Sequence, residues 1–261
     1  MGIILGGNTL SGTNFNSLGE LPATPNMVTD NLVLHLDAGN NSSYLNSSNY
    51  YDCGYGCQYY ASNPGCTNCN TQWKDISGRG TDGTLVNGTA INYDTGGGAM
   101  FFDGSNDYVS VSNSNLNHTN QNWTYSAWIN FSSTPSLGTI FENGSWTSCL
   151  LIRFETNGIT IYSMGSYWGK FTLVPTLNVW YKVDFVRSGN NIIYYLNGAN
   201  SGSIGFSANV LPSPNLFIGM SQHSAGQCFH GRIAVASIYN RALSASEILQ
   251  NFNNGRQRFG V

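Results

Sequence analysis

The chain has 261 residues, only 9 % of them charged, and its 10 lysines and arginines against 13 acidic residues give a net charge of −3. No basic cluster is present to neutralise a run of phosphates, so nucleic acid is not expected as a partner. No apolar run reaches the roughly 18 to 20 residues that span a bilayer, so no membrane segment is expected either.

Residues 1–30 show no sustained hydrophobic period and are rich in glycine, asparagine and serine. This composition predicts an extended N-terminal arm rather than a folded unit. The first letters, MGIILGGN, lack the basic and apolar regions of a secretory signal. We therefore expect no export by that route.

The pattern changes at residue 31. In NLVLHLDA, Leu32, Leu34 and Leu36 fall on one face and polar residues on the other, which is the period of a strand. The same signal recurs in DYVSVS, WTYSAWINF, LLIRFE, GITIYS, WYKVDFVRSG, NIIYYLNG, NLFIGM and GRIAVASIYN. Many short strands joined by Asn-Gly and Gly-Asn turns predict an all-β, two-sheet antiparallel sandwich.

One segment near the C-terminus is typical of a helix. In LSASEILQNF, Ser244 can act as the N-cap and Glu247 can close a capping box. The pattern predicts a short helix over residues 245–253, ended by Gly255.

Four segments, at residues 99–111, 125–130, 180–199 and 231–252, together resemble the laminin-G-like or concanavalin A-like jelly-roll superfamily. Within it, LVLHLDAGN, WKDISGRGTDGTLVNG and NFNNGRQRFGV resemble domains in structural proteins of tailed bacteriophages. The resemblance implies a jelly roll over residues 31–261. It places a cysteine-rich insertion at about residues 45–72, where relatives have a short turn.

The resemblance also implies a role. We expect a non-catalytic virion structural protein, a capsid decoration or cement protein assembled in the host cytoplasm and displayed on the virion surface. The arm would dock on capsid or tail proteins, and a homo-oligomer is expected. One alternative is a tail-fibre or other virion adhesin that binds host-surface glycan. A second is a secreted carbohydrate-binding module or a glucanase-like enzyme.

The insertion holds Cys53, Cys57, Cys66 and Cys69 within 17 residues that contain little to fill a core. Their C-x3-C and C-x2-C spacing could hold one zinc ion through four thiolates. Two disulfides are equally compatible with this spacing, and both alternatives stay open. In either form the cysteines would staple an insertion that cannot build a core of its own.

Three aromatic residues in turn-rich segments, Trp146, Tyr167 and Trp168, are candidates to stack on the apolar face of a sugar. The alternative is that they close the ends of the sandwich. Trp128 and Trp180, on alternating strands, are predicted to be core.

Asp103 and Asp107 in FDGSNDY are candidate calcium ligands, because loop acids bind calcium in some laminin-G-like relatives. The alternative is that both aspartates fix a turn through hydrogen bonds to the backbone.

A glycosidase needs two carboxylates placed about 5 to 9.5 Å apart. The chain contains no alternating array of acids, and its glutamates are few: Glu20, Glu142, Glu155 and Glu247. Catalysis is therefore not expected.

Overall fold

The computed structural model describes residues 4–5, 8–9, 26–40, 42–44, 71–92, 97–112, 116, 122–133, 137–144, 150–163, 165–208, 213, 215–223 and 226–261. All elements below lie within these ranges. The four cysteines of the insertion and Trp146 lie outside them.

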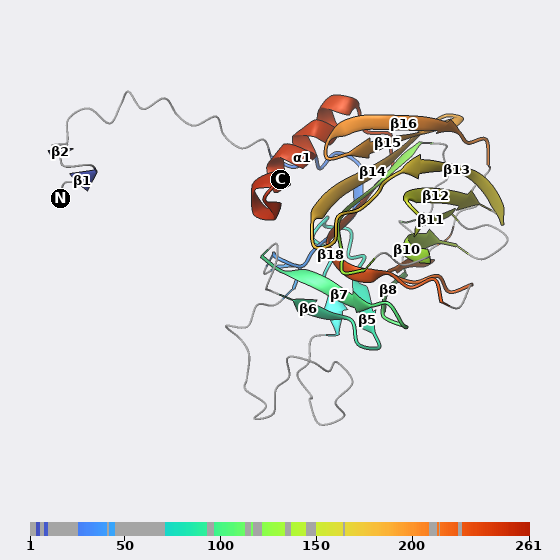
Figure 1. Cartoon of the computed structure of the whole chain (residues 1–261), viewed down its shortest axis with the longest axis horizontal. Helices are drawn as coiled ribbons and strands as arrows, with labels where there is room; N and C mark the ends of the chain where they lie inside the picture. Colours follow the sequence, from blue (N-terminus) through green and yellow to red (C-terminus); the bar gives the residue numbers. More distant parts are fainter. Residues whose placement is uncertain are drawn as a thin grey trace.

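Two antiparallel sheets form a sandwich (Figure 1), as the alternating segments predict. We call one of them the front sheet and the other the back sheet. The front sheet has eight strands, in the order β13 (Ser166–Thr172), β12 (Gly158–Ser163), β11 (Leu150–Glu155), β10 (Leu137–Asn143), β17 (Asn215–Ile218), β8 (Tyr108–Ser112), β5 (Gly83–Val86) and β4 (Gln72–Trp73).

The back sheet has the order β16 (Ala199–Gly205), β15 (Asn191–Leu196), β14 (Trp180–Ser188), β9 (Trp123–Phe131), β18 (His230–Tyr239), β7 (Ala99–Asp103) and β6 (Ala90–Asn92). Strand β3 (Leu32–Asp37) pairs with the second half of β18, beyond the part of β18 that pairs with β7. The first and last strands of the domain are thus neighbours. A separate short pair, β1 (Ile4–Leu5) and β2 (Asn8–Thr9), lies within the expected arm.

The core between the sheets is built from the inward members of each alternating strand. Tyr125, Ala127 and Ile129 of β9 belong to it, as do Ile159 and Ile161 of β12. The hairpins have the expected turn chemistry: Asn157 and Asn197 have positive φ (64° and 50°), as does Gly198 (78°). Each of these turns joins neighbouring antiparallel strands, so the predicted sandwich is confirmed.

A third layer covers the outer face of the back sheet. Helix α1 (Ala245–Phe259) lies across it, on the side away from the front sheet (Figure 1). The predicted capping box is present, because Ser244 N–H donates to Glu247 Oε2 at 2.8 Å and Glu247 N–H donates to Ser244 Oγ at 3.3 Å. The described residues contain no helix long and apolar enough to cross a membrane.

The helix does not end at Gly255, and that prediction is wrong. It continues to Phe259, and Gly260 forms the C-cap with φ 70°. Gly255 instead permits close packing: a Cβ there would lie 2.9 Å from Nε1 of Trp128. The extra turn brings Phe259 onto Trp128, with ring centroids 4.2 Å apart, so burial of aromatic surface favours the longer helix.

Trp128 and Trp180 are buried, but beneath α1 and not between the sheets. Both tryptophans are therefore core residues, as predicted, but they belong to a separate apolar cluster beneath α1. Every residue of β9 is buried, because its two faces are covered by different layers.

The described chain packs against the jelly roll from Asn26, before the expected boundary at residue 31. Val28 N–H donates to Asn251 Oδ1 of α1 at 2.8 Å, and Tyr239 donates to the Val28 carbonyl at 2.9 Å. Gln250 of α1 donates to the Asn26 carbonyl at 2.6 Å. These bonds tie the end of the arm to the helix.

Because Gly255 lies against Trp128, any larger side chain at residue 255 should destabilise the fold. Gly255→Val should lower the free energy of unfolding by about 2 kcal/mol, because the new side chain overpacks a rigid indole. Asn253→Val places the same side chain two residues away on α1 and should change the free energy of unfolding by less than about 0.5 kcal/mol. Urea unfolding of both variants measures this; equal losses would contradict the packing argument.

The capping box predicts a pH dependence. The hydrogen bonds from Arg241 lower the pKa of Glu247 from 4.5 to about 2. A depressed carboxylate pKa adds stability above pH 4.5 that is lost as the pH falls toward 2. Glu247→Gln should therefore cost about 1 kcal/mol at pH 7, allowing for solvent screening, and almost nothing at pH 2. A difference that stays constant across unfolding curves at both pH values would contradict this.

Candidate functional site

Two of the three candidate glycan residues, Tyr167 and Trp168, fall on strand β13 and point in opposite directions. Tyr167 is 57 % exposed on the outer face of the front sheet. Its neighbour Trp168 faces inward and packs edge-on against Phe206, with centroids 5.1 Å apart. Both lie in a strand and not in the expected turn-rich segment, so alternation separates them. Among the described candidates, Tyr167 is the aromatic ring available to a ligand.

Strand pairing places a second tyrosine beside it. Tyr162 on β12 pairs directly with Tyr167, and their ring centroids are 5.5 Å apart at 64°. The guanidinium of Arg153 on β11 lies over the Tyr162 ring, 4.4 Å from its centroid. We call Arg153, Glu155, Thr160, Tyr162 and Tyr167 the tyrosine platform.

Glu155 holds the platform together. Its Oε2 accepts hydrogen bonds from Arg153 at 3.0 Å, from Thr160 at 3.2 Å and from the Tyr162 hydroxyl at 3.4 Å. Burial alone would raise the pKa of Glu155, but the hydrogen bond and charge of Arg153 outweigh it and hold the pKa below its ordinary value. The carboxylate is therefore ionised at neutral pH and holds the Tyr162 hydroxyl.

A second acid lies toward the middle of the same face. Glu142 on β10 is buried; its Oε2 accepts from the Ser221 hydroxyl at 2.5 Å, and its Oε1 lies 2.6 Å from Nδ1 of His223. Serine and histidine thus both contact the carboxylate. Because the serine hydroxyl donates to Glu142 and not to the imidazole, these side chains do not form the serine–histidine pair of a catalytic triad.

The segment that carries Ser221 and His223 also fixes the platform. Gln227 accepts from Arg153 Nη1 at 2.7 Å, and its carbonyl accepts from the Thr139 amide on β10 at 3.2 Å. These contacts lie across the middle of the front face. The exposed part of the platform is therefore at the β12–β13 edge.

The two candidate calcium ligands hold a turn. Asp107 Oδ1 accepts from the Gly88 amide at 2.7 Å, and Oδ2 accepts from the Asp103 amide at 3.0 Å. Asp103 Oδ1 accepts from the Ser105 amide at 2.7 Å. Burial raises the pKa of Asp107. In the described part of the chain, no three His, Cys, Asp or Glu side chains are grouped so that they could hold a metal ion.

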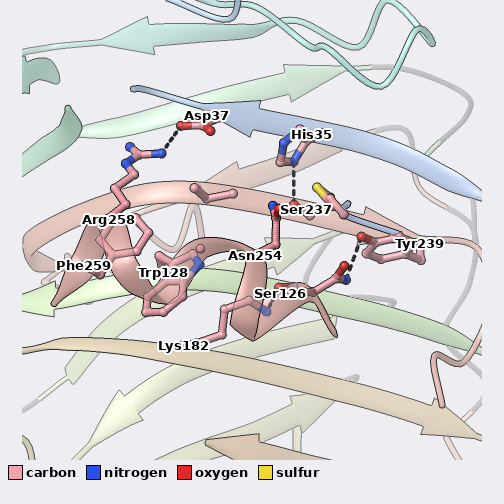
Figure 2. Close-up of a pocket in the computed structure, with 14 residues that line it drawn as sticks. His35, Asp37, Ser126, Trp128, Lys182, Ser237, Tyr239, Asn254, Arg258 and Phe259 are labelled. Atoms are coloured by element: carbon pink, nitrogen blue, oxygen red, sulfur yellow. Dashed lines mark hydrogen bonds and ion pairs between the residues drawn. The ribbon is translucent and has the colours of Figure 1, made fainter. Parts of the chain in front are cut away.

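A separate cavity of about 190 Å³ lies between α1 and the back sheet (Figure 2). Ser126, Lys182 and Ser237 line it from the sheet, and Asn254 and Arg258 from the helix. Sequence reasoning missed this cavity, since it requires knowing which sheet face the helix covers. It also missed Tyr162 and Arg153, although alternation in GITIYS and LLIRFE puts both on the polar face.

Comparison with known proteins gives one family. The model for the concanavalin A-like lectin/glucanases superfamily matches residues 102–249. No curated protein sequence matches the chain.

Solved structures share the fold at low identity. The binding domain of botulinum neurotoxin DC, in complex with rat synaptotagmin II, aligns with TM-score 0.62 and 16 % identity over 87 % of this chain and 52 % of that one. Domain 4 of AbnA, a GH43 extracellular arabinanase from Geobacillus stearothermophilus, in complex with arabinotriose, aligns with TM-score 0.62 and 16 % identity over 84 % and 97 %. The binding domain of Paraclostridial Mosquitocidal Protein 1 aligns with TM-score 0.62 and 16 % identity over 86 % and 52 %.

The chain spans about half the length of the neurotoxin domain but nearly all of the arabinanase domain. These likenesses concern the fold, and they agree with the family match over more than half of the sequence. The chain belongs to the concanavalin A-like lectin/glucanase superfamily and carries a lectin-like jelly roll.

Proposed function

We propose that this jelly roll is a non-catalytic module that binds neutral glycan on the tyrosine platform. The observation that carries the proposal is the exposed ring of Tyr167 at the edge of the front sheet, with the half-buried Tyr162 paired beside it. An aromatic ring buries the apolar C–H face of a sugar while its rim stays in water. The Tyr167 ring offers such a surface to one sugar unit, and Tyr162 supports it edge-on with the ring centroids 5.5 Å apart.

The platform is preorganised, which favours binding. Arg153 is held from three sides, by Glu155, Gln227 and the Tyr162 ring, so Tyr162 loses little further freedom when a ligand stacks on it. The charges of Arg153 and Glu155 cancel at a separation of 3.0 Å. A neutral sugar therefore suits the platform better than an acidic one.

Two features support binding without catalysis. Glu155 is held ionised by Arg153, which makes it a poor proton donor at neutral pH. Glu142 is buried and contacts Ser221 and His223. The arabinotriose complex of the arabinanase domain adds that a domain of this fold can bind a sugar chain.

The proposal also includes a biological setting, the virion of a tailed bacteriophage. Its support is the sequence resemblance of LVLHLDAGN, WKDISGRGTDGTLVNG and NFNNGRQRFGV to virion domains. The protein would be a homo-oligomeric capsid decoration protein on the virion surface, docked through its arm. A tail-fibre adhesin is the second candidate, and it is favoured by the same exposed Tyr167.

The proposal keeps two places for metal or cross-link chemistry. Cys53, Cys57, Cys66 and Cys69 would form two disulfides or one zinc site. Calcium at Asp103 and Asp107 would have to compete with the backbone amides that already donate hydrogen bonds to both carboxylates.

Removing one ring tests the platform. Tyr167→Ala should weaken glycan retention about tenfold or more without changing the melting temperature, because the side chain is mostly exposed. Val174→Ala, which truncates another exposed apolar side chain, is the matched control and should bind as the parent does. Binding is measured on a printed array of neutral and acidic bacterial surface glycans. Unchanged retention by Tyr167→Ala would remove the platform from consideration.

Truncation tests the virion setting. A chain lacking residues 1–25 keeps Met27 and Val28, whose contacts with α1 and Tyr239 belong to the folded domain. It should fold and keep its glycan binding, yet fail to appear on particles assembled in infected cells. Incorporation at the parent level, measured by mass spectrometry of purified particles, would show that the arm does not dock.

A further inference from the structure

The cavity beneath α1 has a polar floor and partly apolar walls. Ser126, Lys182 and Ser237 come from three neighbouring strands of the back sheet, and Trp128 and Phe259 contribute aromatic surface (Figure 2). The volume of the cavity is about 190 Å³. It is smaller than the roughly 300 Å³ at which pockets for drug-sized ligands begin.

The formal charges around the cavity balance. Lys182, whose side chain is 5 % exposed, forms an ion pair with Asp184, and Arg258 donates to Asp37 at 2.6 Å. Burial lowers the pKa of His35, whose Nδ1 lies 2.8 Å from Ser237 Oγ, so this ring is neutral at neutral pH. An anion or cation entering here would lose its hydration without finding an unpaired countercharge.

Hydrogen-bonding capacity nevertheless remains. Ser126 Oγ accepts from Lys182 Nζ at 2.7 Å, which leaves its own hydroxyl hydrogen to donate. Asn254 is exposed and lines the cavity from α1, where its side-chain amide can both donate and accept a hydrogen bond. The lining thus offers a hydroxyl from the sheet and an amide from the helix, and Trp128 and Val235 add apolar surface.

We propose that this cavity is a second binding site, distinct from the tyrosine platform, for one small neutral molecule rich in hydroxyl groups, the size of a polyol or a single sugar unit. Its hydroxyls would bond Ser126 at the floor and Asn254 on α1, and its C–H surface would contact Trp128 and Val235. Because α1 supplies the roof, an occupied site ties the helix to the back sheet.

The test is a titration of the isotope-labelled full chain with glycerol, glucose and, as the charged comparator, sodium acetate. The indole N–H signal of Trp128, assigned by its loss in Trp128→Phe, should shift saturably with glycerol or glucose and not with acetate. Asn254→Ala removes one hydrogen bond from a helix position that tolerates alanine, so the dissociation constant should rise about threefold to tenfold. Asn253→Ala is the matched control and should leave the titration unchanged.

Each other outcome overturns the proposal. An indole signal that does not saturate with either neutral probe means a cavity that holds only water, and saturation by acetate means the wrong ligand class. Equal constants for Asn254→Ala and the parent mean that the probe binds elsewhere. If the Trp128 signal no longer shifts in Tyr167→Ala, the probe binds on the tyrosine platform. If the platform instead proves to bind no glycan, the titration of the cavity still stands as a separate test.

Discussion

The outer face of the back sheet has to be covered, and much of the domain's organisation depends on how this happens. Strand β9 places Trp128 on that face and β14 places Trp180, and burying each indole is worth about 3 kcal/mol. Helix α1 supplies the cover, with Phe252 and Phe259 against the indoles. Gly255 sets how close the helix can approach.

The sheet face beneath α1 carries polar groups as well as the indoles, and these polar groups explain the cavity. Lys182 and Asp184 are both almost completely buried, and burying such a pair costs several kcal/mol of desolvation per ion unless hydrogen bonds replace the lost water. Ser126 supplies one such bond, while Asp184 Oδ2 has no partner among the described residues. A helix packed tightly over these groups would leave more of them unsatisfied. A cavity that admits polar atoms is the less costly arrangement.

Much of this architecture could be predicted from local patterns. Alternation gives strands such as β9 and β14, Asn-Gly turns give the hairpins, and Ser244 with Glu247 gives the start of α1. The end of α1 could not be predicted in the same way. A glycine in a helical pattern can end the helix or allow close packing against a neighbour such as Trp128, and the sequence is the same in both cases. Deciding between them requires the tertiary partner.

The platform shows the same limit at the level of a site. Tyr167 and Trp168 look equivalent as neighbouring aromatics, and only the inward or outward direction in β13 separates them. Tyr162, Arg153 and Glu155 come together through the register of β11 and β12, which sets Arg153 opposite Thr160. The turn between the strands fixes that register. Which side chains meet in the platform can therefore be predicted only once the pairing of β11 with β12 is known.

The acids on the front face decide what kind of site it is. A carboxylate that transfers protons near neutral pH needs a raised pKa and an open approach. Glu155 has three hydrogen-bond donors and a lowered pKa, and Glu142 is buried against Ser221 and His223. Both acids are engaged with other side chains of this face. With its acids engaged in this way, the face presents at its β12–β13 edge the exposed ring of Tyr167 beside Tyr162.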